Sequence, residues 1–293
     1  MRITTRAPAR HAKPRPMTAR PPVDAGFNRT GPFTPEGDGT PGCYKEEEHL
    51  VSTRLAPAQC LETSGVKGML LSLARTYNRL GGLLEALGEV AGLDPVAMLA
   101  VWQVESGGRT FTPGRAVLRF ENHKLFKYWG ASHRLLFDRH FRFGGRLGIA
   151  GRPHQHHQFR PIEAKPWQWN HVDDQDVEYS AYKLAGSLAG DEAASLSASW
   201  GGPQIMGFNH RACGYPSARA LADAFQVDER WHVLAFADFC RSHDLIAIMR
   251  RLDWFTFGQR YNGDGAGYGP RIARAFALKS ALRSLPPRRP CRA

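Results

Sequence analysis

Three short segments decide the fold of this 293-residue chain, and they occur in a fixed order. The first, VESGG, covers residues 104–108. The second, SWGGPQIMGFNH, covers residues 199–210, and the third, RYNG, covers residues 260–263. Each segment interrupts a helical pattern with glycine, so the three predict turns at which polar side chains leave a helical core.

The first segment ends a helix that presents an acid. Asp94-Pro95 is a strong helix start, because an N-cap acid precedes a proline at the first helical position, and Gly107-Gly108 ends the helix. Glu105 therefore lies in the last turn, where the negative end of the helix dipole disfavours a carboxylate. Trp102 lies one turn earlier, and an apolar environment also raises a carboxyl pKa. Both effects favour a protonated acid near neutral pH.

The other two segments carry polar and aromatic side chains beside turns. Gly201-Gly202-Pro203 breaks the chain in the second segment, and such a break brings backbone groups and the Gln204 amide close to a ligand. Trp200 is either a platform on which a sugar stacks or a buried core residue. Tyr261 and Asn262 are either ligand contacts or a buried tyrosine and the end of a helix.

In their order and residue types, the three segments resemble the landmarks of the lysozyme superfamily, which includes goose-type lysozymes and lytic transglycosylases. Residues 93–277, and above all the run from Ser197 to Tyr215, more closely resemble the phage-endolysin N-acetylmuramidase family. The resemblance implies a peptidoglycan hydrolase that cleaves the β-1,4 bond between N-acetylmuramic acid and N-acetylglucosamine, with Glu105 as the proton donor. It also implies a set of substrate-binding residues: Ser106, Trp200, Gln204, Asn209, Tyr261 and Asn262. The stretch after residue 263 lacks the family's usual tyrosine–lysine spacing.

Glu121 is our candidate for a second catalytic carboxylate. It lies in Phe120-Glu121-Asn122-His123, which resembles a Phe-Glu-x-His element of the family. An inverting enzyme needs a base about 6.5–9.5 Å from the acid, whereas a retaining enzyme has its carboxylates about 5–5.5 Å apart. The alternative is a structural ion pair between Glu121 and a nearby arginine.

The periodicity predicts a mainly α, lysozyme-like domain over residues 63–282 with a loop-rich insertion between residues 109 and 177. Residues 1–62 are expected to form a disordered Pro/Arg-rich tail, and residues 283–293 a basic C-terminal tail. Two helices are expected between residues 64 and 90, and the final helix is expected at about residues 270–282. The insertion is expected to form loops, short helices and a small strand pair, and the second landmark segment is expected to begin at the end of a helix. Further helices are expected to be capped by Ser217, Asp228 and Asp253. Five cysteines, an odd number without a CxxC pair, suggest neither a disulfide framework nor a zinc ribbon.

The net charge of +12 lies mainly on the two ends and on residues 109–160, which hold eleven Lys/Arg against two acids. This distribution suits attraction to an anionic cell-wall surface and to peptidoglycan glycan strands. We expect a monomer that needs no cofactor, binds no nucleic acid and has no membrane span. The histidines at 154, 156 and 157 are expected to lie in a solvated loop rather than at a metal site. The basic, proline-rich N-terminus is not expected to be a secretory signal peptide, so the protein is expected to be made in the cytoplasm and to reach the wall after release.

Two other functions compete with hydrolysis. A lytic transglycosylase would use the same acid but close a 1,6-anhydro ring with the substrate's own hydroxyl, and it would need no second carboxylate. A non-catalytic wall-binding protein would use the same cleft without cleaving the bond.

Overall fold

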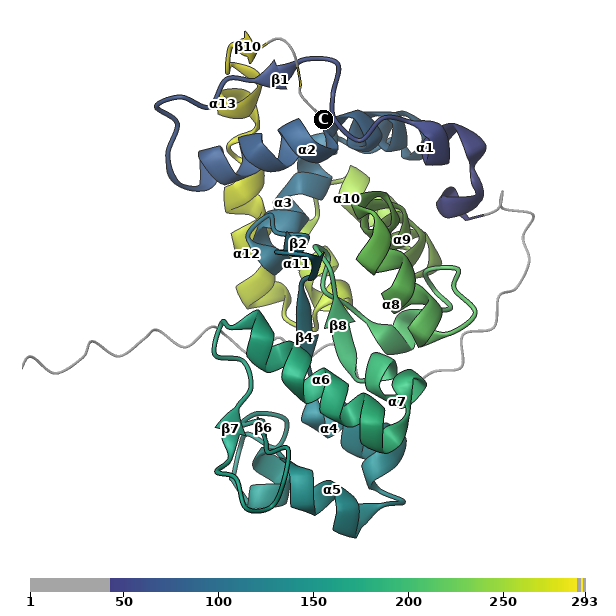
Figure 1. Ribbon diagram of the computed structural model, residues 1–293. Coiled ribbons are helices and arrows are strands. Elements are labelled where there is room, and N and C mark those ends of the chain that lie inside the picture. The colour runs from purple at the N-terminus through teal and green to yellow at the C-terminus, as the bar shows by residue number, and fades with distance from the viewer. Residues whose placement is uncertain (1–42, 289–290, 292–293) are drawn as a thin grey trace, which may run out of the picture.

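The computed structural model describes residues 43–288 and residue 291, and helices dominate it (Figure 1). The α-helices are α1 Glu48–Ser52, α2 Gly68–Ala91, α3 Pro95–Ser106, α4 Asn122–Leu125, α5 Arg134–His140, α6 Gln175–Ala189, α7 Asp191–Leu196, α8 Ala218–Val227, α9 Glu229–Ser242, α10 Leu245–Arg250, α11 Trp254–Tyr261, α12 Gly265–Phe276 and α13 Lys279–Arg283. The shorter helical turns are η1 Tyr44–Glu46, the π-type η2 Phe126–Gly130, η3 Gly144–Leu147 and η4 Gly207–Asn209. The mainly α class expected from the sequence is confirmed.

Helix α3 has the ends that the sequence predicts. The Asp94 side chain accepts a hydrogen bond from the Val96 amide at 2.9 Å, and Gly107 ends the helix in the left-handed conformation with φ +65°. Most of its residues are buried, and it packs against α2 and α12. The last turn of α3 therefore lies between two other helices, where a side chain can be taken out of water.

Helix α2 is one helix of 24 residues and not the two helices that we expected. Gly81 and Gly82 lie between the two expected helices, where they allow another segment of the chain to approach closely. A Cβ on Gly82 would lie 2.4 Å from the Ala56 carbonyl oxygen and 2.5 Å from that of Arg54. The Leu55 carbonyl accepts a hydrogen bond from the Gly82 amide at 2.9 Å, so the segment before α2 is fixed to its middle.

A small antiparallel sheet joins the second landmark segment to the strand that precedes Glu121. Its strands are β4 Leu118–Phe120, β8 Ala198–Trp200 and β9 Ile205–Met206, in the order β4-β8-β9. Leu118 pairs with Trp200, and Ser199 pairs with Met206. The beginning of the second segment is thus a strand, not the helix end that we expected, and residues 201–204 form the loop of a hairpin.

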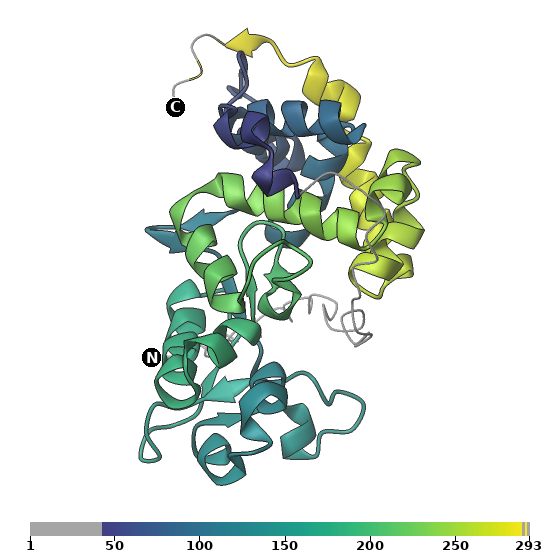
Figure 2. The same ribbon diagram turned by 90° about the vertical axis from the view of Figure 1, so that its right-hand side faces the viewer.

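The insertion lies at one end of the molecule, opposite α1, α2 and α13 (Figures 1 and 2). It contains α4, η2, α5 and a second sheet of β5 Phe141–Arg142, β6 Gln158–Phe159 and β7 Gln168–Trp169. The buried phenylalanines at 137, 141, 143 and 159 belong to the main hydrophobic core. This small sheet matches the loops, short helices and strand pair expected there.

The two ends of the described chain are joined, which corrects part of the expected tails. Residues 44–46 and 48–52 are helical, and β1 Cys60–Leu61 pairs with β10 Pro287–Arg288. A disulfide links Cys60 to Cys291 across 231 positions of sequence, although the odd cysteine count suggested no such framework. The final helix is also divided, into α12 and α13, and begins earlier than residue 270. The rest of the expected tails, residues 1–42, 289–290 and 292–293, lies outside the described residues.

A further pair of strands, β2 Phe111–Thr112 and β3 Arg115–Ala116, forms a hairpin directly after α3. None of the helices among the described residues combines the length and apolar character needed to cross a bilayer.

Candidate active site

Glu105 is a partly exposed residue at the end of α3, and its carboxylate accepts a hydrogen bond from the Tyr268 hydroxyl of α12. Burial of the carboxyl raises the pKa of Glu105 to about 8, against the lowering effects of Tyr268 and of the nearby Arg271 and Arg119. The acid therefore carries its proton at neutral pH. This is the protonation state that a general acid needs.

Tyr268 is the residue that the sequence interpretation missed. Asp264 caps α12 by accepting a hydrogen bond from the Gly267 amide at 2.7 Å, which places Tyr268 and Arg271 one turn apart. The Tyr268 ring stacks on that of Tyr261, with centroids 6.2 Å apart, and Arg271 donates to the Val104 carbonyl at 3.2 Å. The signal in the sequence was the cap at Asp264, which predicts a helix face bearing both side chains.

The hairpin loop at residues 201–204 packs directly behind α3. A Cβ on Gly202 would lie 2.0 Å from the Trp102 indole nitrogen, and one on Gly201, whose φ is +67°, would lie 2.3 Å from His232 Nδ1. The Tyr261 hydroxyl donates a hydrogen bond to the Pro203 carbonyl at 2.8 Å. All three landmark segments thus meet around the end of the helix that carries Glu105.

Gln204 stabilises this loop with both ends of its amide. It accepts a hydrogen bond from the Ser199 hydroxyl at 3.0 Å and donates one to the Gly201 carbonyl at 2.8 Å. The residue is partly exposed and has a φ of +51°. Asn209, in η4, is also partly exposed, and its side-chain nitrogen finds no hydrogen-bond partner in the part of the chain that the structure describes. The Gln204 amide is thus engaged within the loop, and the Asn209 side-chain nitrogen is buried.

Four of the predicted substrate-binding residues are instead core residues. Trp200 is 1% exposed, Tyr261 2%, Asn262 4% and Ser106 5%. The Trp200 indole donates to the Ser195 carbonyl at 3.2 Å, and its ring meets that of Tyr182 edge-on. Trp200 therefore packs as a core tryptophan, which was the alternative interpretation, and no sugar can stack on it in this arrangement. Tyr261 supports the hairpin loop and Tyr268 rather than a ligand.

Glu121 is buried, with 4% of its surface exposed, and it follows β4. Its carboxylate accepts a hydrogen bond from Arg119 Nε at 2.9 Å and lies 3.2 Å from His157 Nδ1. Burial alone would raise the pKa of Glu121, but the combined effect of His171, His157 and Arg119 holds it well below its ordinary range. The structure therefore supports the ion-pair interpretation of Glu121.

The expected solvated loop is wrong for His157, which is buried, whereas His154 is exposed and His156 is partly exposed. The ligand atoms of Glu121, His157 and His171 lie within 4.8 Å of one another, so their residue types could in principle hold a metal ion. However, His171 Nε2 lies 2.9 Å from the Phe120 carbonyl oxygen, where it must carry a proton. The positive charge that balances the carboxylate is already supplied by the Arg119 guanidinium. The cluster is therefore an ion pair between Glu121 and Arg119 with histidine side chains around it.

The comparisons with known proteins agree with this arrangement. The family model for Muramidase, described as N-acetylmuramidase, matches residues 94–278. Among solved structures, the chain is similar to the one described as "Crystal structure of Burkholderia AP3 phage endolysin". The identity is 27%, the TM-score is 0.50, and the match covers 68% of this chain and 70% of that one. The comparison with curated proteins gives no match.

The solved structure confirms the expected lysozyme-like fold of the endolysin type. The family model spans more than half of the chain and contains Glu105, the hairpin loop and Tyr268. This protein therefore belongs to the N-acetylmuramidase family, as a phage-endolysin-type muramidase that hydrolyses peptidoglycan.

Proposed function

We propose that the protein cleaves the β-1,4 bond between N-acetylmuramic acid and N-acetylglucosamine, with Glu105 as the general acid. The observation that carries this proposal is the state of the Glu105 carboxyl: it is protonated at neutral pH, hydrogen-bonded by Tyr268 and placed where the three landmark segments meet. Glycoside cleavage needs a proton on the leaving oxygen while positive charge develops at the sugar ring.

After the proton is transferred, Glu105 becomes a carboxylate in a poorly solvated position. The Tyr268 hydroxyl donates to that carboxylate, and the Arg271 and Arg119 charges lower its energy further. Burial weakens the acid enough for it to keep its proton at neutral pH. These three groups oppose burial, so Glu105 can still release that proton during cleavage. Gln204 and Asn209 are our candidates for contacts with the sugar, because both match the second family segment and both are partly exposed.

Glu121 is a positioning residue in this proposal and not a second catalytic carboxylate. It is bound by Arg119, whose charge acts on Glu105, so it holds that guanidinium in place. The proposed reaction then depends on one carboxyl group. This observation favours a second candidate, the lytic transglycosylase, in which the substrate's own hydroxyl attacks. Mass spectrometry of the released fragments separates the two reactions, because anhydro ends are lighter by one water.

The experiment for Glu105 is the isosteric substitution Glu105→Gln, with Glu163→Gln as a matched control on the exposed surface of the insertion. Glu105→Gln should abolish the loss of turbidity of a cell-wall suspension and preserve sedimentation of the protein with the walls. Glu163→Gln should behave as wild type. Lysis by correctly folded Glu105→Gln at the wild-type rate would refute general-acid catalysis by Glu105. It would also refute the role of Tyr268, which acts through Glu105.

A further inference from the structure

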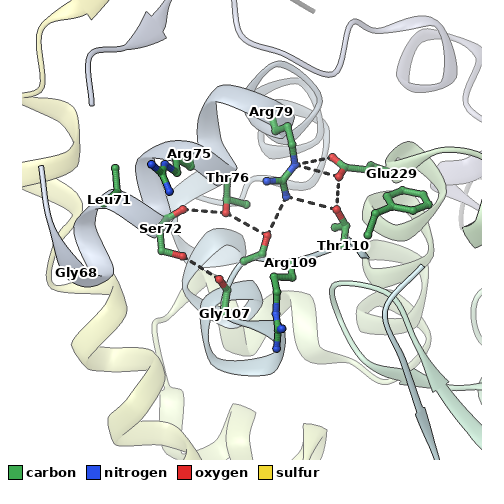
Figure 3. Close-up of a pocket in the computed structure, with 12 residues that line it drawn as sticks. Gly68, Leu71, Ser72, Arg75, Thr76, Arg79, Gly107, Arg109, Thr110 and Glu229 are labelled. Carbon is green, nitrogen blue, oxygen red and sulfur yellow. Dashed lines mark hydrogen bonds and ion pairs between the residues drawn. The ribbon is translucent and has the colours of Figure 1, made fainter. Parts of the chain in front are cut away.

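A pocket of about 520 Å³ lies behind the turn that follows Glu105, on the side of α2 (Figure 3). We call it the arginine pocket, because Arg75, Arg79 and Arg109 line it together with Ser72, Thr76 and Glu229. Glu105 does not line it. The pocket is therefore a separate feature from the site of proton transfer, and the reaction described above does not use it.

Its charges are unequally satisfied. Arg79 binds both Glu229 carboxylate oxygens at 2.9 and 3.0 Å and the Gly108 carbonyl at 2.8 Å, so this pair forms a neutral wall. Arg75 is exposed, and no acidic or hydrogen-bonding group within residues 43–288 binds its guanidinium. Arg109 pairs with Asp173 at 3.4 Å, and both side chains are more than half exposed, so this ion pair is weak. With three arginines and one glutamate, the lining has a net charge of +2.

The pocket is fixed to the turn at Gly107 and Gly108, which follows Glu105. The Ser72 hydroxyl donates to the Gly107 carbonyl at 2.9 Å, and Arg79 donates to the next carbonyl, that of Gly108. Figure 3 shows Arg75 and Arg109 on two sides of this contact, with Ser72 and Gly107 between them. A ligand bound by Arg75 would thus lie on the α2 side of the turn at Gly107 and Gly108 that follows Glu105.

We propose that the arginine pocket binds a carboxylate of the peptide that branches from the glycan strand. A guanidinium group binds an oxyanion through paired hydrogen bonds, and Arg75 offers such a group without a partner among the described residues, whereas Arg109 already donates to the Ser106 carbonyl and pairs with Asp173. A carboxylate on the strand that is being cut is favoured over a separate anionic polymer, because the pocket shares its wall with the turn that carries the general acid. This inference rests on the proposed function and adds a contact outside the sugar rings.

The test compares kcat/KM on two soluble substrates, glycan fragments that carry their peptides and the same fragments after the peptides are removed. The variants are Arg75→Gln and Arg75→Glu, and the controls are Arg134→Gln and Arg134→Glu, at an exposed arginine of the insertion. Arg75→Gln should lower kcat/KM about tenfold on the peptide-bearing fragments through KM, as expected for one lost charged hydrogen bond. Arg75→Glu should lower it further. Neither should change cleavage of the bare fragments, and the Arg134 variants should match wild type on both.

Three results would overturn the proposal. Equal activity of Arg75→Glu and wild type on peptide-bearing fragments would show that the pocket makes no contact with the peptide. An equal loss on both substrates would show that Arg75 only supports the turn. The third result is competitive inhibition of the wild type by inorganic phosphate that Arg75→Gln relieves, while the substitution affects kcat/KM on both substrates alike. This result would assign the pocket to a phosphate-bearing polymer. In each case, cleavage that still depends on Glu105 would leave the proposed function intact.

Discussion

The hydrogen bond from Tyr268 to Glu105 predicts a shift in the pH dependence of the enzyme. The bond stabilises the carboxylate, so it opposes the burial that raises the pKa of Glu105. With the bond in place, this pKa is about 8. In Tyr268→Phe the ring and its stack on Tyr261 remain, and only the donor is lost. The pKa of Glu105 should therefore rise above its wild-type value.

The size of the shift follows from the strength of the bond. A hydrogen bond to a charged group contributes about 1.5–3 kcal/mol, and one pKa unit corresponds to about 1.4 kcal/mol. The expected rise is about one to two units. Because a general acid works only while it is protonated, the alkaline limb of kcat/KM should move from about pH 8 toward pH 9 or above.

The assay is the initial rate on soluble glycan fragments between pH 5 and pH 10, with circular dichroism to confirm the fold. Tyr77→Phe is the matched control, because Tyr77 also donates to a glutamate, Glu85, but lies outside the candidate active site on α2. Its alkaline limb should equal that of wild type. An unmoved limb in Tyr268→Phe, or one moved to lower pH, would refute the role of this bond in setting the acidity of Glu105.

Three further predictions follow from the same contacts. Glu121→Gln should lower the free energy of unfolding in urea by about 2 kcal/mol, since it removes the carboxylate charge that pairs with the half-buried Arg119, and should keep kcat/KM within about tenfold of wild type; loss of a catalytic base would instead cost about 10²–10⁴-fold. Gly202→Ala should lower thermal stability by about 1–3 kcal/mol and reduce activity, because its Cβ would overlap the Trp102 ring; a variant with wild-type stability would contradict the close packing behind α3. The pKa of His232 is lowered by burial to about 4, so the unfolded chain binds more protons between pH 6.5 and 4 and stability is lost as the pH falls through this window; His232→Gln should recover up to about 3 kcal/mol of the wild-type loss between pH 7 and pH 4, and equal losses in the two proteins would disprove this.

The sequence was sufficient where the interactions that decide a structure are local. The ends of α3 were predicted because the Asp94 cap and the glycine at its end act within one turn of the helix. The caps of α8, α9 and α11 at Ser217, Asp228 and Asp253 are confirmed for the same reason. The order of the three segments also sufficed to identify the family, since it needs only the residue types and their spacing.

The sequence was insufficient where residues distant in the chain meet. Two helices were predicted between residues 64 and 90, where the structure has the single helix α2, against which residues 54–56 pack. Cys60 finds Cys291 only because the two ends of the domain lie side by side. His157 was predicted to be solvated, and Glu121 was the candidate for a second catalytic carboxylate. Both are buried next to Arg119, which indicates a structural role for each.

The sequence by itself determined which carboxyl group delivers the proton in our proposal, because the helix end, the apolar turn before it and the glycines after it are all encoded within residues 94–108. Only the tertiary structure decided what that carboxyl group contacts. Tyr268 reaches Glu105 across 163 positions of sequence, and the three landmark segments meet through a hairpin, a tyrosine hydroxyl and a glycine packed on an indole. Such contacts depend on how whole helices pack, and helix packing is set by the shape of the core rather than by any local pattern.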